Sequence, residues 1–289
     1  MRTLLTGGTG FIGSAVLDEL VGAGHDVHAV VRSDRAAAQV AERGAVPLLL
    51  DVTDVDAFAA ALDGFDAAVH TASPAEGADA FNAAVLEAVV RPFADGRRFV
   101  LTSGVWVYGD NIDLSEDSPH DAPELVAWRV PQEERLLASS VDARIVVPGV
   151  VYGHGKGLVG LVTGGPRTPD GALRLIGDGE QHWTLVHVDD LARLYLAALE
   201  HDGPVGRVIA SDGSPTTVRA IAEAVAGDAG VVPETTDATR ARLGTAFADA
   251  LLLDQVAVGD RARTLLGWAP EQVSVLDEVA RAEAETRAA

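Results

Sequence analysis

The chain has 289 residues and no cysteine, so disulfide bonds, a thiolate nucleophile and a cysteine-ligated metal are all excluded. Lysine is nearly absent as well, because every basic residue except Lys156 is an arginine. Tyrosine occurs three times, at Tyr108, Tyr152 and Tyr195. Any reaction that needs a lysine or a tyrosine side chain therefore has very few candidate residues in this chain.

Positive charge is scarce, since 22 Lys and Arg residues face 43 Asp and Glu residues, for a formal net charge of −21. Such a field repels phosphate backbones and anionic lipids, so we expect neither nucleic acid nor a membrane surface as a partner. Long apolar runs are also missing, because stretches such as residues 83–90 contain a charge and are shorter than the roughly 20 residues of a membrane span. Polar residues 6–8 interrupt the first apolar run before any secretory signal is complete, and we expect a soluble, cytoplasmic protein.

Short runs rich in β-branched residues alternate with longer alanine-rich segments in the first half of the chain, which is typical of βαβ units and a parallel sheet. A denser distribution of Gly and Pro follows Gly149, and Asp189 with Asp190 is predicted to open a later helix as its acidic N-cap and first turn. We predict an α/β fold, with a doubly wound parallel sheet over residues 1–148 and a smaller substrate-binding region over 149–289 that is interleaved with it. The predicted strands are residues 2–6, 26–31, 46–50, 67–70, 98–102, 143–147 and 183–188, and the predicted helices 12–23, 35–43, 55–62, 78–90 and 123–139.

A glycine-rich string, Thr6-Gly-Gly-Thr-Gly-Phe-Ile-Gly13, joins the first predicted strand to the first predicted helix. In that context Gly7 permits the tight turn, Gly10 lets the backbone approach phosphates, and Gly13 lets the helix pack close to the sheet. The helix N-terminus then faces the anion. The string, with Phe11 and Ile12 inside it, predicts a dinucleotide pyrophosphate site, and the alternative is an ordinary strand-to-helix turn.

The end of the second predicted strand distinguishes between the two nicotinamide dinucleotides. NAD-binding folds place an acidic residue there, whereas this chain has Arg32 and Ser33. Arg32 can bind a 2′-phosphate through two N–H groups while Ser33 donates to it, which favours NADP. The alternative is NAD, with Arg32 on the surface and Asp34 accepting from the ribose 2′-hydroxyl.

Asp51 and Val52 follow the third predicted strand and are candidates for the adenine contact. The carboxylate of Asp51 can accept from the adenine amino group, and Val52 can pack on the ring. Asp51 is also a plausible N-cap for the helix that is predicted to begin near Val55.

These features resemble the extended short-chain dehydrogenase/reductase superfamily, in particular its NAD-dependent epimerase/dehydratase branch, over nearly the whole chain. The resemblance implies a Rossmann-type fold, contacts of Thr71, Ala72 and Ser73 with the cofactor, and passage of Pro148 close to the nicotinamide. It also implies a possible homodimer through two helices that flank the central strands. The matching motifs are TGGTGFIGS at residues 6–14, Asp51-Val52, HTAS at 70–73, TSGVWVYG at 102–109, PGVVYG at 148–153, WTLVHVDDLA at 183–192 and LGWAP at 266–270.

The usual catalytic side chains of that family are absent, so the chain looks like an atypical subgroup of it. The positions of its Ser or Thr, its Tyr and its Lys correspond here to Gly104, Leu125 and Arg129. Arg129 can keep the ribose-binding role of the Lys, but Leu125 has no proton to transfer. Tyr152 and Lys156 have the four-residue spacing, yet two intervening glycines provide no helical face, so we expect no catalytic pair there.

Replacement chemistry must come from residues near the carboxyl ends of the fifth and sixth strands. Tyr108 is the first candidate for the proton donor, and its alternative is a packed aromatic residue whose hydroxyl meets a backbone carbonyl. Ser103 can position a substrate carbonyl or cap a turn. Arg129 completes the catalytic candidates, and Glu133 with Glu134 is predicted to lie on a solvated helix face.

The eight histidines show no metal-ligand spacing, and we predict no metal site. His70 is expected to line the cofactor, and His187 to serve the strand-to-helix junction before Asp189.

Three functions stay open. The first is an NADP(H)-dependent oxidoreductase acting on a small carbonyl or alcohol, with sugar-derived compounds among the candidate substrates. The second is a protein that binds NAD(P) without turnover, as a sensor or a partner of another protein. The third is a sugar-nucleotide epimerase or dehydratase, a reaction that depends on the missing Tyr and Lys.

Overall fold

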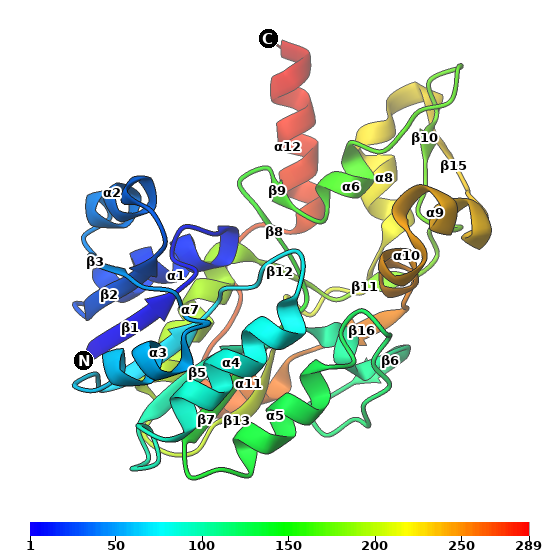
Figure 1. Ribbon diagram of the computed structural model, residues 1–289. Coiled ribbons are helices and arrows are strands. Elements are labelled where there is room, and N and C mark those ends of the chain that lie inside the picture. The colour runs from blue at the N-terminus through cyan, green and yellow to red at the C-terminus, as the bar shows by residue number, and fades with distance from the viewer. Residues whose placement is uncertain (289) are drawn as a thin grey trace.

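The computed structural model describes residues 1–288, with side chains through residue 284, and within them seven parallel strands form a central sheet (Figure 1). The strand order is β13-β7-β5-β4-β1-β2-β3, and it reverses between β1 and β4. Ligands of open α/β sheets bind at that reversal, beyond the carboxyl ends of the strands. The strands are β1 (Arg2–Thr6), β2 (Asp26–Val31), β3 (Val46–Leu49), β4 (Ala67–His70), β5 (Arg98–Thr102), β7 (Asp142–Pro148) and β13 (Gly206–Ala210).

Helices cover both faces of the sheet, so its inner strands are largely apolar and buried. Successive side chains point to opposite faces: Leu4 packs with Phe58 in one core, whereas Leu5 packs with Leu17 in the other. The first face holds α3 (Val55–Ala61), α4 (Ala78–Val90) and α5 (Arg129–Leu137). The second holds α1 (Phe11–Gly22), α2 (Asp34–Glu42), α7 (Val188–Glu200) and α11 (Asp260–Leu266).

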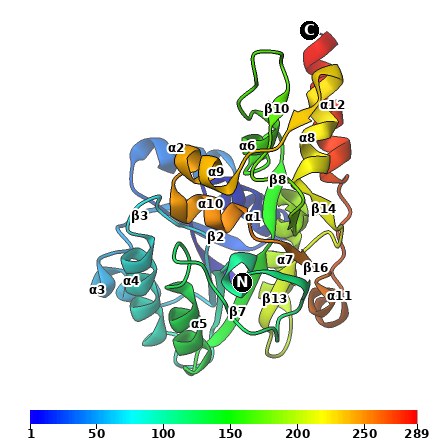
Figure 2. The ribbon, with the colours of Figure 1, turned by 90° about the vertical axis from the view of Figure 1, so that its right-hand side faces the viewer.

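A third hydrophobic core lies beyond the carboxyl ends of the sheet, where small sheets and helices of the second half pack together (Figures 1 and 2). Leu173, Trp183 and Ile221 are buried in it. Its helix α12 points away from the sheet toward the C-terminus. The elements of this region are β8 (Val150–Gly153), β9 (Lys156–Gly157), α6 (Gly160–Thr163), β10 (Leu173–Arg174), β11 (His182–Trp183), β12 (Leu185–His187), β14 (Thr216–Thr217), α8 (Val218–Ala226), the 3-10 turn η2 (Gly227–Ala229), β15 (Val231–Val232), α9 (Thr236–Leu243), α10 (Thr245–Leu251) and α12 (Val275–Ala288).

Two elements of the second half return to the sheet. Strand β13 pairs in parallel with β7, and α7 packs across the sheet face beside α1. Below the third core, β16 (Gln255–Ala257) pairs with β6 (Asn111–Leu114), which follows the 3-10 helix η1 (Val105–Tyr108). Chain from both halves therefore contributes to one sheet and its covering layers.

The prediction of an α/β fold with a doubly wound parallel sheet is confirmed, and two local predictions are wrong. The helix predicted over 123–139 begins only at Arg129, after a run of turns. Pro131 then lies in the first turn, where its missing N–H needs no helical partner; a helix from residue 123 would place it in the interior. The strand predicted over 183–188 is split into β11 and β12, and His187, instead of an aspartate, caps α7.

Among the described residues, no helix combines the length and the apolar character that crossing a membrane requires.

Candidate functional site

Two cavities lie side by side along the carboxyl edge of the sheet, and Phe11 and Ile12 line both of them. The first, of about 570 Å³, adjoins the ends of β1, β2 and β4 and is called the dinucleotide cavity below. The second, of about 390 Å³, adjoins the ends of β5 and β7 and is called the inner cavity. Predicted cofactor residues line the dinucleotide cavity at Gly7, Gly10, Phe11, Ile12, Gly13, Arg32, Ser33, Val52, Thr71, Ala72 and Ser73, whereas Arg129 and Pro148 line the inner cavity.

The glycine-rich string forms a cradle that side chains would fill. A Cβ on Gly13 would lie 2.1 Å from the carbonyl oxygen of Gly7, so only glycine lets α1 approach this closely. Gly7 has a φ of +80°, and the amide of Gly10 donates to its carbonyl at 2.8 Å. Gly10 is the N-cap of α1 and provides no capping side chain. The free amides at this helix start fit the phosphates of a dinucleotide.

The far end of the dinucleotide cavity is built by the loop between β2 and α2. Ser33 is the N-cap of α2, and its hydroxyl accepts from the amide of Ala36 at 3.3 Å. The hydroxyl proton of Ser33 stays available to a ligand. Arg32 is exposed and borders the same cavity. An arginine, a hydroxyl and a helix N-terminus together form a suitable environment for a phosphate group.

Asp51 is held by its own turn and is not among the residues that line the cavity. Its carboxylate accepts from the amide of Thr53 at 2.9 Å and from the Thr53 hydroxyl at 2.7 Å. These hydrogen bonds keep the pKa of the exposed Asp51 below its usual range. The N-cap of α3 is Asp54, which accepts from Ala57, so the expectation that Asp51 caps this helix is wrong. The adenine contact of Asp51 stays a prediction.

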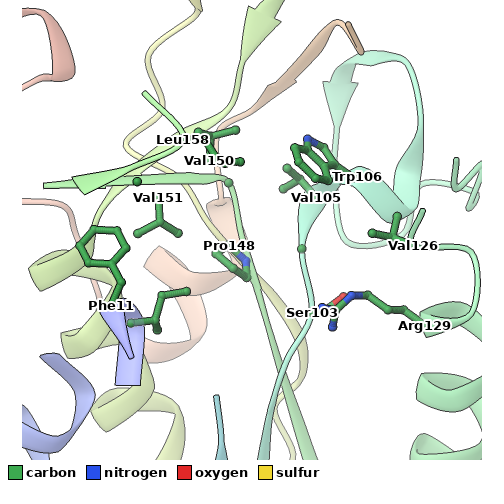
Figure 3. Close-up of a pocket in the computed structure, with 14 residues that line it drawn as sticks. Phe11, Ser103, Val105, Trp106, Val126, Arg129, Pro148, Val150, Val151 and Leu158 are labelled. Atoms are coloured by element: carbon green, nitrogen blue, oxygen red, sulfur yellow. The ribbon is translucent and has the colours of Figure 1, made fainter. Parts of the chain in front are cut away.

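The inner cavity is lined mainly by aliphatic and aromatic side chains (Figure 3). Phe11 and Val151 lie on one side of it and Trp106 and Val126 on the other, with Pro148 between them. Among the described residues that line it, Ser103 and Arg129 supply the hydroxyl and the charge. We therefore expect a largely apolar ligand with one polar group.

Arg129 extends toward the strand end that bears Ser103 (Figure 3). Its Nη1 donates to the carbonyl of Thr102 at 2.9 Å, and its guanidinium carbon lies 4.6 Å from the ring centroid of Trp128. Burial lowers the pKa of Arg129, although a guanidinium remains charged at neutral pH. The remaining N–H groups can donate to a ligand in the inner cavity.

Ser103 is held by a buried carboxylate that the sequence analysis misplaced. Its hydroxyl donates to Oε1 of Glu133 at 2.5 Å, and Oε2 of Glu133 accepts from Nε of Arg207 at 3.2 Å. Glu133 is only 1% exposed, so the prediction of a solvated helix face is wrong for it and holds only for its exposed neighbour Glu134. The signal in the sequence for the burial of Glu133 is its helical spacing, because residue 133 lies on the same helix face as the buried Leu136.

Tyr108 does not occupy the position that a proton donor needs. It is 2% exposed in the sheet core, its hydroxyl donates to the carbonyl of Glu116 at 3.4 Å, and it is not among the residues that line either cavity. Burial raises the pKa of its phenol above the usual value. These surroundings favour the alternative of a packed aromatic residue, and a catalytic function of Tyr108 stays a prediction.

The positions of the usual family residues offer no replacement hydroxyl. Gly104 lines the inner cavity without a side chain, and Leu125 is 37% exposed in the turn before α5. Tyr152 and Lys156 lie on the two strands of the β8–β9 hairpin, and the Tyr152 hydroxyl donates to the carbonyl of Val273 at 3.0 Å. These two side chains do not share a helical face.

His70 lies behind the dinucleotide cavity and is not one of the residues that line it. Its Nδ1 is 2.6 Å from the Thr6 hydroxyl, and its Nε2 is 3.1 Å from the side-chain oxygen of Asn82. Burial lowers its pKa to about 4, so the ring is neutral at pH 7. His70 therefore fixes the ends of β1 and β4 and the start of α4.

Three side chains near the start of α7 bring possible metal ligands together. His154, His187 and Asp189 each place one such atom within 4.8 Å of the others. Nε2 of His154 lies 3.0 Å from the carboxylate of Asp189, and His187 accepts from the amide of Asp189 at 3.2 Å as the helix cap. The three residues are thus held by contacts among themselves, and the absence of a metal site stays a prediction.

Known proteins resemble this chain along most of its length. The model of the NAD dependent epimerase/dehydratase family matches residues 3–210. A 3-diazoavenalumate denitrifying reductase of a Streptomyces species is 30% identical over 97% of this chain and 100% of its own. A UDP-glucose 4-epimerase of Mycolicibacterium smegmatis is 26% identical over 97% of each chain. The solved human epimerase family protein SDR39U1 with NADPH aligns with a TM-score of 0.76, at 24% identity over 97% of this chain and 99% of that one. Because the family model spans both cavities and most of the sheet, this chain belongs to the NAD-dependent epimerase/dehydratase family.

Proposed function

We propose that the protein is an NADP(H)-dependent oxidoreductase that interconverts a small, largely apolar carbonyl compound and its alcohol. The observation that supports this most is the inner cavity, which adjoins the dinucleotide cavity and holds Ser103 and Arg129 in an apolar lining. Its volume of about 390 Å³ lies at the small end of the range for ligand sites.

The dinucleotide cavity supports a nicotinamide cofactor through its shape and its donors. Phosphates would be held by the amides at the start of α1, and the adenosine end would lie along Arg32, Ser33 and Val52. Arg32 and Ser33 favour NADP over NAD, because they replace the acidic residue that NAD-binding folds place at this strand end. The bound nicotinamide would exchange a hydride with the substrate carbon.

Residues of the inner cavity would orient the substrate and exclude water. Arg129 would donate to the substrate oxygen and stabilise the negative charge that develops on it during reduction. Phe11, Val151 and Leu158 would pack on the apolar part of the substrate. The epimerase alternative is less well supported, because Arg129 is the single cation among the residues that line this cavity and a sugar diphosphate offers two negative charges.

A second candidate function is NADP(H) binding without turnover. Gly104 and Leu125 favour it, because neither can move a proton. This candidate requires the dinucleotide cavity alone, whereas the oxidoreductase requires both cavities to be occupied.

The experiment that distinguishes these functions combines binding with turnover. The protein is mixed with NADPH, and binding is followed by nucleotide fluorescence. Consumption of NADPH is then measured with benzaldehyde, hexanal and cyclohexanone. We expect tight NADPH binding and consumption with one or more of the apolar carbonyl compounds. Binding without consumption across the panel would contradict the oxidoreductase and favour the second function.

A further inference from the structure

The buried Glu133 has no part in the function proposed above, although its carboxylate accepts a hydrogen bond from Ser103, which lines the inner cavity. We propose that Glu133 acts through Ser103 as a proton relay that replaces the missing tyrosine, with Ser103 as the catalytic residue and Glu133 as its positioning residue. This inference rests on the proposed oxidoreductase function.

The direction of the Ser103 hydrogen bond determines what the cavity can bind. Because the hydroxyl proton points to Oε1 of Glu133 at 2.5 Å, the oxygen of Ser103 has its lone pairs free for a donor. Arg129, in contrast, offers only donors. An alcohol oxygen satisfies both, because it donates its proton to Ser103 and accepts from Arg129. The pair is therefore suited to a substrate hydroxyl on an otherwise apolar molecule.

During oxidation of an alcohol, the relay transfers two protons while the substrate carbon loses a hydride. The substrate O–H bond breaks and its proton moves to Oγ of Ser103, while the Ser103 proton moves to Oε1 of Glu133. A bound, oxidised nicotinamide would accept the electron pair of the substrate C–H bond as a hydride, and the carbon–oxygen bond would become double. Reduction runs through the same positions in reverse, so it starts from protonated Glu133.

Burial and a hydrogen bond from an arginine fix the carboxylate of Glu133 in place. It is 1% exposed, and Arg207 of β13 donates to its second oxygen at 3.2 Å. Glu134 shares the same arginine at 2.8 Å but is exposed and has no contact with Ser103. The charged and titratable groups that face Glu133 are Arg129 of α5, Arg207 of β13, Tyr108 of η1 and Glu134 of α5.

The neighbouring glutamates offer a matched test. Glu133→Gln keeps the size of the side chain and removes its ability to take a proton, whereas Glu134→Gln removes the other ion pair of Arg207. Oxidation of benzyl alcohol and cyclohexanol by NADP⁺ is measured from pH 5 to pH 9. We expect Glu133→Gln to lower kcat about 100-fold with little change in KM or in NADPH binding, and to abolish the fall of the oxidation rate at acid pH. Glu134→Gln should keep the profile of the unaltered protein.

Two further measurements can contradict the relay even if Glu133→Gln folds poorly. Ser103→Ala leaves the Glu133–Arg207 pair intact and should also lower kcat about 100-fold. Infrared difference spectra of the unaltered protein without substrate should show a buried carboxylic acid that forms as the pH is lowered. The absence of this band, or an unchanged kcat and pH profile in Ser103→Ala, would overturn the relay.

The outcomes also separate the relay from the function on which it rests. If the unaltered protein turns over substrate, and Glu133→Gln has the same rate and the same fall of that rate at acid pH, the relay alone is overturned. If the unaltered protein oxidises no alcohol and reduces no carbonyl compound, the proposed function and the relay are both overturned.

Discussion

Single side chains at the carboxyl edge of the sheet differ in function because of what surrounds them. Ser103 and Tyr108 come from the same segment after β5, yet Ser103 lines the inner cavity and Tyr108 is packed in the core. Glu133 and Glu134 are adjacent in α5, and one is buried against Ser103 while the other is exposed. Hydrogen-bond partners and burial, more than residue type, decide which of these groups can act on a ligand.

Arg32 is the residue that tests the cofactor preference. Replacing Arg32 by Ala removes a charged donor from the end of the dinucleotide cavity and should weaken NADPH binding about ten-fold, as expected for a charge-assisted hydrogen bond of about 1.5 kcal/mol. NADH lacks the 2′-phosphate and should bind almost as before. Fluorescence titrations with both nucleotides measure this, and Arg91→Ala, which removes an exposed arginine at the end of α4, controls for net charge. Equal losses for both nucleotides would show that Arg32 does not contact the phosphate.

His70 makes the stability of the folded chain depend on pH. Its pKa is about 4 in the folded chain and about 6.5 when exposed, so the unfolded chain binds more protons between these values. The free energy of unfolding should therefore fall as the pH drops from 6.5 to 4, by about 3 kcal/mol from this group.

Urea unfolding of the unaltered protein and of His70→Gln, at pH 7 and pH 4.5, isolates that contribution. The variant should lose less stability between the two pH values than the unaltered protein does. His154→Gln changes an exposed ring and should behave like the unaltered protein. A pH dependence that is the same in all three proteins would show that His70 does not titrate in this way.

At the scale of elements, the walls of the inner cavity come from a strand end, a 3-10 helix, the start of α5 and the β8–β9 hairpin. The hairpin requires glycine at one position: Gly157 has a φ of +93°, and a Cβ there would lie 2.1 Å from the carbonyl of Val151. The same glycine packs near the Phe11 ring, which both cavities share. The hairpin is therefore held in one place against the glycine-rich string.

Replacing Gly157 by Ala should displace this hairpin and open the inner cavity to water. We expect kcat/KM for the carbonyl substrate to fall at least ten-fold, while NADPH binding changes less because the glycine cradle is untouched. Gly160→Ala in the adjacent helix α6 is the control, since a Cβ there meets nothing within 4 Å. Steady-state kinetics and nucleotide titration of both variants measure the difference. Normal turnover by Gly157→Ala would mean that the hairpin does not shape the substrate site.

At the scale of the whole molecule, the last part of the chain is tied back to the sheet through Asp190 of α7. This buried carboxylate accepts from the amides of Glu271 and Gln272 at 3.0 and 3.1 Å and pairs with Arg193. The Trp268 indole donates to the Asp190 carbonyl at 2.8 Å. The segment before α12 is thus fixed to a helix that covers the central sheet.

Replacing Asp190 by Asn leaves its size unchanged but turns one acceptor into a donor that faces other donors. The free energy of unfolding should fall by about 2–4 kcal/mol, because a buried, charged hydrogen-bond acceptor is lost. Asp202→Asn is the control, since that carboxylate is 97% exposed in its pair with Arg98 and should contribute less than about 1 kcal/mol. Urea unfolding measures both, and similar losses in the two variants would contradict the anchoring function of Asp190.

Sequence patterns alone predicted the strands of the sheet and the glycine cradle, because both depend on local sequence. Strands β1, β2, β4 and β5 have the predicted bounds, since an apolar run between turn residues specifies a buried strand by itself. Gly7, Gly10 and Gly13 lie where a single turn places them.

The tertiary structure decided which side chains reach the inner cavity. Tyr108 was the first candidate for the proton donor in the sequence and Ser103 only a positioning residue, and it is the packing of η1 against the core that reverses this order. Glu133 was missed because its partners, Ser103 and Arg207, lie 30 and 74 positions away in the chain. Contacts between residues this far apart depend on how strands β5 and β13 and helix α5 pack, and no local pattern contains that information.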